Sequence, residues 1–133
     1  MSEEEKRRIT LTEIIIGVII LFLLSVIIPG FFSLQGRIKR AMTKGNLGVL
    51  RKGLEYYYHR NASTYPETLQ QLVPEYIGNI PKVELGYLFR YHKTRESTNN
   101  FSDSGKWYYN STTGEIYIDS FHKDDEQRTI SDW

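Results

Sequence analysis

The residues from Ile14 to Phe32 form an apolar run of nineteen residues with no charged side chain. At about 1.5 Å of rise per residue, a helix of this length spans roughly 28 Å, close to the ~30 Å hydrocarbon core of a bilayer. Three basic residues, Lys6, Arg7 and Arg8, precede the run, and one carboxylate, Glu13, stands at its start. The run predicts a membrane-spanning helix, and any account of the chain must also explain Glu13.

A secretory signal peptide is the main alternative interpretation of this segment, and it fits poorly. The apolar run is longer than the usual h-region of about 7–15 residues, and the nearest cleavage-like sequence, SLQG at 33–36, is a weak match. Orientation in a membrane stays open, because the positive-inside rule counts basic residues on both sides of the run. The basic residues that follow the run are Arg37, Lys39, Arg40 and Lys44.

Helical periodicity continues beyond the apolar run. Apolar residues recur at three- and four-residue spacing, so we expect one helix from about Thr10 to Tyr58, apolar all round in its first half and amphipathic in its second. Pro29 is expected to kink or loosen this helix. The predicted parts are a basic leader at 1–8, a transmembrane helix at 9–32, an amphipathic continuation at 33–59 and a globular head at 60–133.

A hairpin is predicted near the end of the chain. Residues 106–110 and 115–119 have the β-branched and aromatic character of strands and flank the four-residue loop 111–114. In the symmetric register, the first and last cross-strand pairs face the long helix and the middle pair faces away. The three pairs are Trp107–Ile118, Tyr108–Tyr117 and Tyr109–Ile116.

The remainder of the head gives fewer signals. The sequence from Thr64 to Glu67 is typical of a capping box and predicts a short helix over 66–73. Residues 87–92 predict a strand, whereas the polar stretch 94–105 predicts a loop without regular structure. Trp133 is expected to pack against the head and hold the end of the chain in place.

Composition and spacing exclude several classes of function. The net charge of +1 argues against a nucleic-acid partner, and the lack of cysteine excludes disulfides, thiolate metal sites and thiol catalysis. The three histidines, His59, His92 and His122, lie in different segments without a metal-binding spacing. Neither a glycine-rich phosphate loop after a strand nor a nucleophile-elbow motif is present. We therefore expect no enzymatic activity.

Four aspartates in or near the later loops are candidate calcium ligands, since carboxylate oxygens are the hard ligands that calcium prefers. Their spacing does not match an EF-hand, and solvated loop charge is the alternative interpretation. The candidates are Asp103, Asp119, Asp124 and Asp125.

Taken together, these segments resemble the type IV pilin superfamily and, within it, the major (G-type) pseudopilins of type II secretion systems. The resemblance begins with the basic leader, Ile9-Thr10-Leu11-Thr12-Glu13 and an apolar helix with a proline near its end. It extends to Tyr65–Leu72, which resembles the family's YP-x-x-L-x-x-L segment, and to Ile80-Pro81-Lys82. Residues 105–116 resemble the family's G-x-W-x-Y and T-G-E-I hairpin.

The resemblance implies an α+β, pilin-like fold, with a long N-terminal helix packed on a small antiparallel β-sheet. It implies a structural subunit that waits in the inner membrane with its head outside the cytoplasm. Assembly machinery would add this subunit to a helical filament of itself and other pilins, either a type IV pilus or a secretion pseudopilus. Within the filament, Glu13 would neutralise the N-terminal amine of a neighbour. Some similar pseudopilins carry a calcium site in their C-terminal loops.

The chain departs from the family pattern at the cleavage site. Prepilin peptidase cuts after a glycine, whereas Arg8 stands before Ile9 here, so cleavage and N-methylation at Ile9 stay open. If the leader is retained, Arg7 or Arg8 could pair with Glu13 instead. Pro29 also stands one residue earlier than usual when counted from Ile9.

Other interpretations of Glu13 and of the chain stay open as well. Glu13 could act only as a helix-start residue that is favoured by the macrodipole. The whole protein could be a single-pass membrane protein whose pilin-like domain binds a ligand or partner without polymerising, or an enzyme on a membrane tether. Assembly of the Glu13→Ala variant separates the filament interpretation from the others.

Overall fold

The computed structural model describes residues 10–86 and 93–133 of the chain. The basic leader, the Arg8–Ile9 junction and the strand expected at 87–92 lie outside the described residues. The chain divides into two compact units, Met1–Gln35 and Gly36–Trp133.

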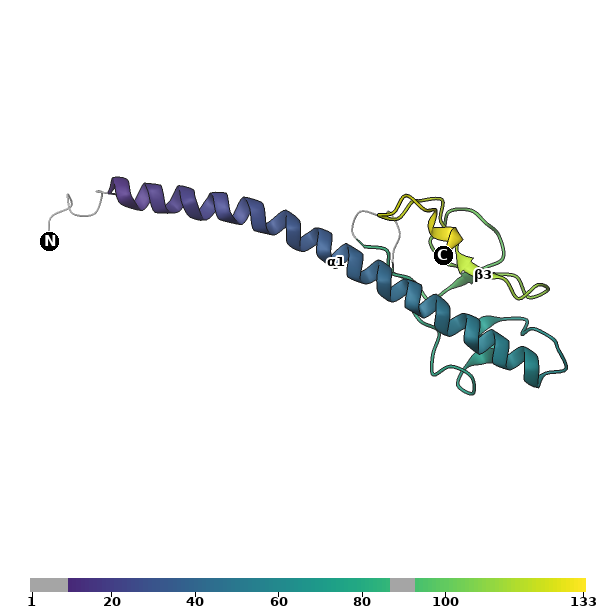
Figure 1. Ribbon diagram of the computed structural model, residues 1–133. Helices are drawn as coiled ribbons and strands as arrows, with labels where there is room; N and C mark the ends of the chain where they lie inside the picture. The colour runs from purple at the N-terminus through teal and green to yellow at the C-terminus, as the bar shows by residue number, and fades with distance from the viewer. Residues whose placement is uncertain (1–9, 87–92) are drawn as a thin grey trace. The chain divides into compact units, whose positions relative to one another are not determined.

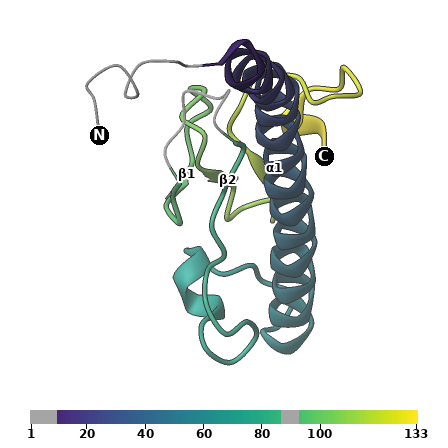
Figure 2. The ribbon, with the colours of Figure 1, turned by 90° about the vertical axis from the view of Figure 1, so that its left-hand side faces the viewer.

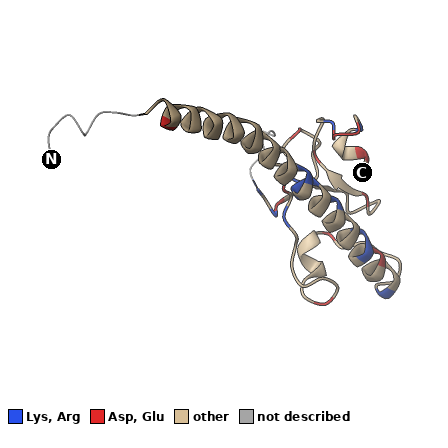
Figure 3. Ribbon diagram, turned by 60° about the vertical axis from the view of Figure 1, so that its left-hand side comes forward, with Lys and Arg blue, Asp and Glu red and all other residues tan. Residues whose placement is uncertain are grey.

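The predicted long helix is confirmed as α1, which runs from Leu11 to Arg60 and continues through Pro29 (Figure 1). In the first unit, every residue from Leu11 to Leu34 is exposed. Figure 3 shows that this part of the ribbon carries charge only at its start, in agreement with the uncharged sequence from Ile14 to Gly36. By length and composition, α1 can cross a membrane.

The second unit places a small sheet beside the later part of α1 (Figures 1 and 2). The sheet has the order β1 (Ser97–Thr98), β2 (Trp107–Tyr109) and β3 (Ile116–Ile118). β2 and β3 are antiparallel, whereas β1 runs parallel to β2. The α+β architecture is therefore confirmed, but the sheet is mixed where an antiparallel one was expected.

The hairpin has the predicted register. Its cross-strand partners are Trp107–Ile118, Tyr108–Tyr117 and Tyr109–Ile116. The first and last pairs are buried, and the middle pair is half-buried with its rings stacked at 4.3 Å. Alternation along the strands thus separates an inner face from an outer one.

The core of the second unit lies between α1 and the inner face of the hairpin. Leu47, Leu50 and Leu54 come from the helix, and each is at most 2% exposed. They belong to one apolar cluster with Trp107 and Ile118 from the strands. Such burial of apolar surface is the main favourable contribution to folding.

Two aromatic side chains in this core also make polar contacts with preceding loops. The indole N–H of Trp107 donates to the carbonyl of Pro81 at 2.8 Å, and the hydroxyl of Tyr109 donates to the carbonyl of Pro66 at 2.6 Å. These two hydrogen bonds attach the strands to the loops before them, since buried polar groups require partners.

The prediction of a helix over 66–73 was wrong. Only Leu69–Leu72 is helical, as the 3-10 helix η2, and Thr68 precedes it without capping it through its side chain. The Thr64 hydroxyl instead donates to the Asn61 carbonyl at 2.6 Å. Thr68 has an extended backbone, with φ −137° and ψ 150°, so no helical turn can run from Pro66 into η2. The Pro66 carbonyl accepts from Tyr109 instead, which is a tertiary contact. The expected apolar face is still buried, at Leu69 and Leu72.

Two later segments can also be compared with the sequence-based expectations. The stretch 94–105 contains β1, so it is not wholly irregular. Trp133 packs against the core as expected, and it follows the 3-10 helix η3, which spans Ile130–Asp132.

Gly114 in the hairpin loop provides a test of this packing. Its φ is +73°, and a Cβ at this position would overlap with the Tyr65 ring. We expect Gly114→Ala to lower the free energy of unfolding of the head by about 2–4 kcal/mol, from overpacking and an unfavourable backbone conformation. Thermal unfolding of the full chain in detergent, followed by tryptophan fluorescence, measures this change.

Gly48→Ala is the matched control, because Gly48 is on the helix and has no atom within 4 Å of its added Cβ. This substitution should be neutral or should stabilise the head by up to about 1 kcal/mol. Equal effects of the two substitutions would contradict the packing described for Gly114.

Candidate functional site

Glu13 lies in the first turn of α1, where it caps the helix. The backbone N–H of Thr10 donates to Oε2 of Glu13 at 2.9 Å. This is one half of a capping box, in which an acidic side chain reaches back to the residue before the helix. The carboxylate therefore has an intramolecular donor in the single chain, and the macrodipole also favours it there. The TLTE sequence could have predicted this contact, because it has the T-x-x-E pattern.

The large apolar side chains of the first unit cover all sides of the helix. Their exposed fractions lie between 45% at Leu24 and 75% at Leu11. A helix that is apolar all round requires either lipid or protein around it. This surface is therefore the first candidate contact region of the chain.

The second unit carries a further set of exposed apolar side chains on α1, which we call the outer stripe: Ile38, Met42, Val49 and Tyr56. Their exposed fractions are 50% to 63%. At 3.6 residues per turn they fall within about 40° of arc. Gly45 lies on the same side, with no atom within 4 Å of the position that its Cβ would occupy.

The outer stripe is on a different side of the helix from the leucines of the core. The buried helix residues in this unit include Thr43, Leu47, Leu50 and Leu54. Thus α1 has two apolar faces here, and the head covers one of them. Only the buried face is needed to explain the fold of the head.

Asp119, one of the predicted calcium ligands, is fully buried at the end of the hairpin. Its carboxylate accepts hydrogen bonds at 2.9 Å from the backbone N–H groups of Ser102, Asp103 and Ser104. The hydroxyls of Ser102 and Ser104 also donate to it. Burial alone would raise the pKa of Asp119, but the hydrogen bonds from Ser104, Ser102 and Asp103 outweigh it and lower the pKa.

The other three predicted ligands also face donors of this chain. Asp103 accepts from the backbone N–H of Phe121 at 2.8 Å and lies 3.7 Å from Nδ1 of His122. Asp124 and Asp125 belong to a separate loop and face arginine side chains. Within residues 10–86 and 93–133, no cluster of three or more His, Asp or Glu side chains has an arrangement that could hold a metal ion.

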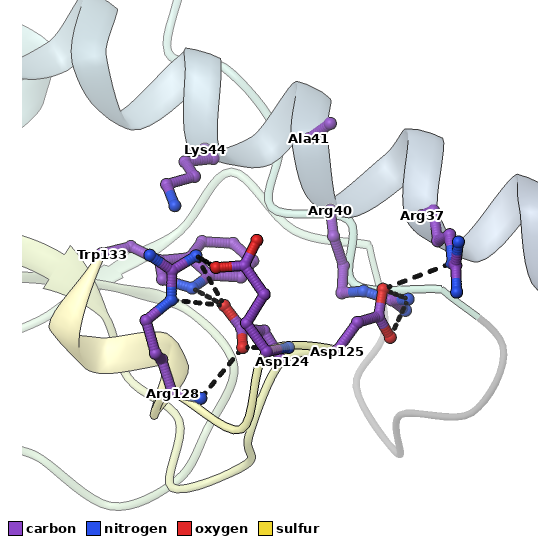
Figure 4. Close-up of a pocket in the computed structure, with 9 residues that line it drawn as sticks. Arg37, Arg40, Ala41, Lys44, Asp124, Asp125, Arg128 and Trp133 are labelled. Atoms are coloured by element: carbon purple, nitrogen blue, oxygen red, sulfur yellow. Dashed lines mark hydrogen bonds and ion pairs between the residues drawn. The ribbon is translucent and has the colours of Figure 1, made fainter.

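The structure brings in one residue that the sequence analysis did not single out as functional. Arg40 is buried on α1 and pairs with Asp125 (Figure 4). The sequence analysis names it only as one of the basic residues that follow the apolar run, and nothing local to it indicates a carboxylate so far along the chain. His59 is exposed at the end of α1, and His92 lies outside the described residues.

We compared the chain with protein-family models, curated proteins and solved structures, and none of the three comparisons found a match.

The buried carboxylate of Asp119 gives a prediction for stability. Asn has the same shape but replaces one acceptor oxygen by a donor, which would face backbone N–H groups. We expect Asp119→Asn to lower the free energy of unfolding at neutral pH by about 1–3 kcal/mol. Asp132→Asn is the control, because Asp132 is an exposed aspartate in the last residues of the same head. Thermal unfolding of both variants measures the difference.

The same contact predicts an acid dependence. Because the folded-state pKa of Asp119 lies below its ordinary value of 3.8, its contribution is present above that pH and is lost as the pH falls through the folded-state pKa. The wild type should therefore lose more stability below this range than Asp119→Asn does. Parallel pH profiles of the unfolding midpoint would contradict the assignment.

Proposed function

We propose that this protein is a non-catalytic structural subunit of a pilus or pseudopilus. The first part of α1 anchors it in the inner membrane, with the head outside the cytoplasm. Assembly machinery then moves it into a helical filament formed with copies of itself or with other pilins. The proposal accounts for exposed apolar side chains on α1 that continue beyond the length needed to cross a membrane.

The outer stripe is the observation that carries this proposal. A membrane anchor explains the apolar surface up to Phe32, but it leaves the stripe from Ile38 to Tyr56 in water. Full burial of such a side chain contributes about 1.5–3 kcal/mol, so a half-exposed one would gain roughly 1 kcal/mol on association. A helical filament buries the stripe of every copy against a different surface of the next copy, because heterologous contacts need not close.

Glu13 supplies the polar part of the proposed assembly. In a single chain its carboxylate accepts from Thr10, and near the membrane interface the cost of its charge is modest. In a filament core without water, it requires a cation from a neighbour. The resemblance to pilins indicates the N-terminal amine of Ile9 after cleavage, and Arg7 or Arg8 if the leader is retained. Either pairing would fix the axial register between neighbours.

A tethered binding protein is the second candidate function. Arg8 favours it, because this residue replaces the glycine after which prepilin peptidases cut. In that case the protein would keep its anchor, and the outer stripe would bind a different membrane protein.

A charged substitution in the outer stripe tests the proposal directly. We expect Val49→Glu to reduce filament yield at least about tenfold. The lost apolar contact of roughly 1 kcal/mol and the cost of burying an unpaired charge together exceed the roughly 1.4 kcal/mol that changes an equilibrium tenfold. The head should keep its unfolding midpoint, because Val49 is half-exposed and faces away from the core. Filaments are measured by electron microscopy and by sedimentation from cells that express the assembly machinery.

Phe121→Glu is the matched control, because Phe121 is a large apolar residue of the head with a similar exposed fraction, 58%, but lies outside the helix. It should leave the filament yield within about twofold of the wild type, equivalent to roughly 0.4 kcal/mol. Equal yields for Val49→Glu and the wild type would contradict a role of the stripe in assembly.

Glu13→Ala tests the register contact. We expect this variant to insert into the membrane and fold its head normally, but to form no filaments, since a neighbour's cation would lack its carboxylate. Thr12→Ala is the control, because it leaves both Thr10 and Glu13 in place. Filaments of normal yield from Glu13→Ala would refute the role that we give to this carboxylate.

A further inference from the structure

The loop between Lys123 and Thr129 is a compact turn within the head. A β-bridge joins these two residues, and the backbone N–H of Asp124 donates to the Arg128 carbonyl at 2.8 Å. Gln127 has a φ of +62° inside the turn. Two adjacent carboxylates, Asp124 and Asp125, thus stand at the start of a tight turn, an arrangement in which loops often bind a cation.

Arg40 holds one of these carboxylates from α1. Its Nη2 donates to both oxygens of Asp125, at 2.8 and 2.7 Å, and its Nη1 donates to the Leu85 carbonyl at 3.4 Å. The Arg40 side chain is only 10% exposed, whereas Asp125 is 50% exposed. One buried cation therefore joins the helix, the segment at Leu85 and the C-terminal loop.

Two glycines make room for this guanidinium. A Cβ on Gly36 would lie 3.2 Å from Nη1 of Arg40, and a Cβ on Gly86 would lie 3.7 Å from the same atom. The Cα of Gly36 would also be 3.1 Å from a Cβ on Gly86. Larger residues at either position would press on the guanidinium or on the helix, so the close approach of the two segments depends on glycine.

The second carboxylate, Asp124, also accepts hydrogen bonds from donors of this chain (Figure 4). Asp124 accepts from the backbone N–H groups of Glu126 and Arg128, from the Arg128 guanidinium and from the indole N–H of Trp133 at 2.9 Å. Burial would raise the pKa of Asp124, but the hydrogen bonds from Arg128, Trp133 and Glu126 outweigh it and lower the pKa.

We propose that the C-terminal loop, residues 123–129, is closed by arginine and not by calcium, with Arg40 in the place of the cation. Calcium takes six to eight oxygen ligands, whereas the oxygens of Asp124 and Asp125 here face guanidinium, indole and backbone N–H donors. A calcium ion on Asp125 would have to displace Arg40 and leave a buried guanidinium without its carboxylate, which is strongly unfavourable. The residues of this loop therefore do not fit the calcium site that the pilin resemblance implies.

Limited trypsin digestion of the full chain in detergent tests this inference, because Lys123 and Arg128 provide cleavage sites inside the loop. When the loop opens and closes quickly, the cleavage rate follows the population of its open form. Wild-type cleavage at these two sites, and the unfolding midpoint of the head, should be the same with EDTA as with excess calcium. Protection of the loop by calcium, or a lower midpoint in EDTA, would overturn the proposal.

Substitutions in the ion pair test the role of arginine. We expect Asp125→Asn and Arg40→Met each to speed cleavage at Lys123 and Arg128 about tenfold or more in either buffer, which corresponds to roughly 1.4 kcal/mol of loop opening. Arg37→Gln is the matched control, because Arg37 also faces Asp125 but at 3.7 Å and with a side chain that is 71% exposed. It should change the rate by less than about twofold, or roughly 0.4 kcal/mol.

The pattern of products distinguishes loop opening from unfolding. Opening of the loop in a folded head raises the cleavage rate at Lys123 and Arg128 alone, whereas unfolding of the head also raises it elsewhere, at sites such as Lys106. If Arg40→Met unfolds the head, Asp125→Asn still decides the question, because Asp125 is on the exposed side of the pair. Wild-type cleavage rates in Asp125→Asn would overturn the proposal.

Discussion

The head depends on the packing of one face of α1 against the inner face of the β2–β3 hairpin. Leu47, Leu50 and Leu54 belong to one apolar cluster with Trp107 and Ile118, and these five side chains are nearly inaccessible to water. Three short strands would have little stability without this helix, because small sheets need an apolar layer to cover them. One face of α1 therefore packs in the core of the head, and the outer stripe is left exposed for another contact.

Polar contacts at the edges of the core complete the head. No buried side-chain nitrogen or oxygen lacks a hydrogen-bond partner within the part of the chain that the structure describes. Asp119 holds the loop at 102–104, Arg40 holds the loop at Asp125, and Trp107 and Tyr109 hold the earlier loops. In a chain without cysteine, these contacts fix long loops that disulfides fix in many small domains.

Local patterns predicted much of this structure. The alternation and loop length of the hairpin gave its register, and the apolar periodicity gave α1 to within two residues of its observed ends. The prediction of a helix over 66–73 was wrong, because Thr68 has an extended backbone that limits the helix to Leu69–Leu72. The Pro66 carbonyl just before it bonds to Tyr109, a partner that is distant in sequence. The sequence could not predict the pairing of Arg40 with Asp125 or the burial of Asp119, since both depend on how separate loops meet.

Cysteine labelling tests most directly whether the outer stripe is the contact between subunits, and the natural lack of cysteine makes single-site labelling clean. A Val49→Cys variant and a Thr112→Cys variant, the latter in the exposed hairpin loop, would be treated with a membrane-impermeant maleimide as detergent monomers and as filaments. Our account predicts that both react as monomers and that only Val49→Cys becomes protected in filaments. Equal labelling of Val49→Cys in the two states would contradict it.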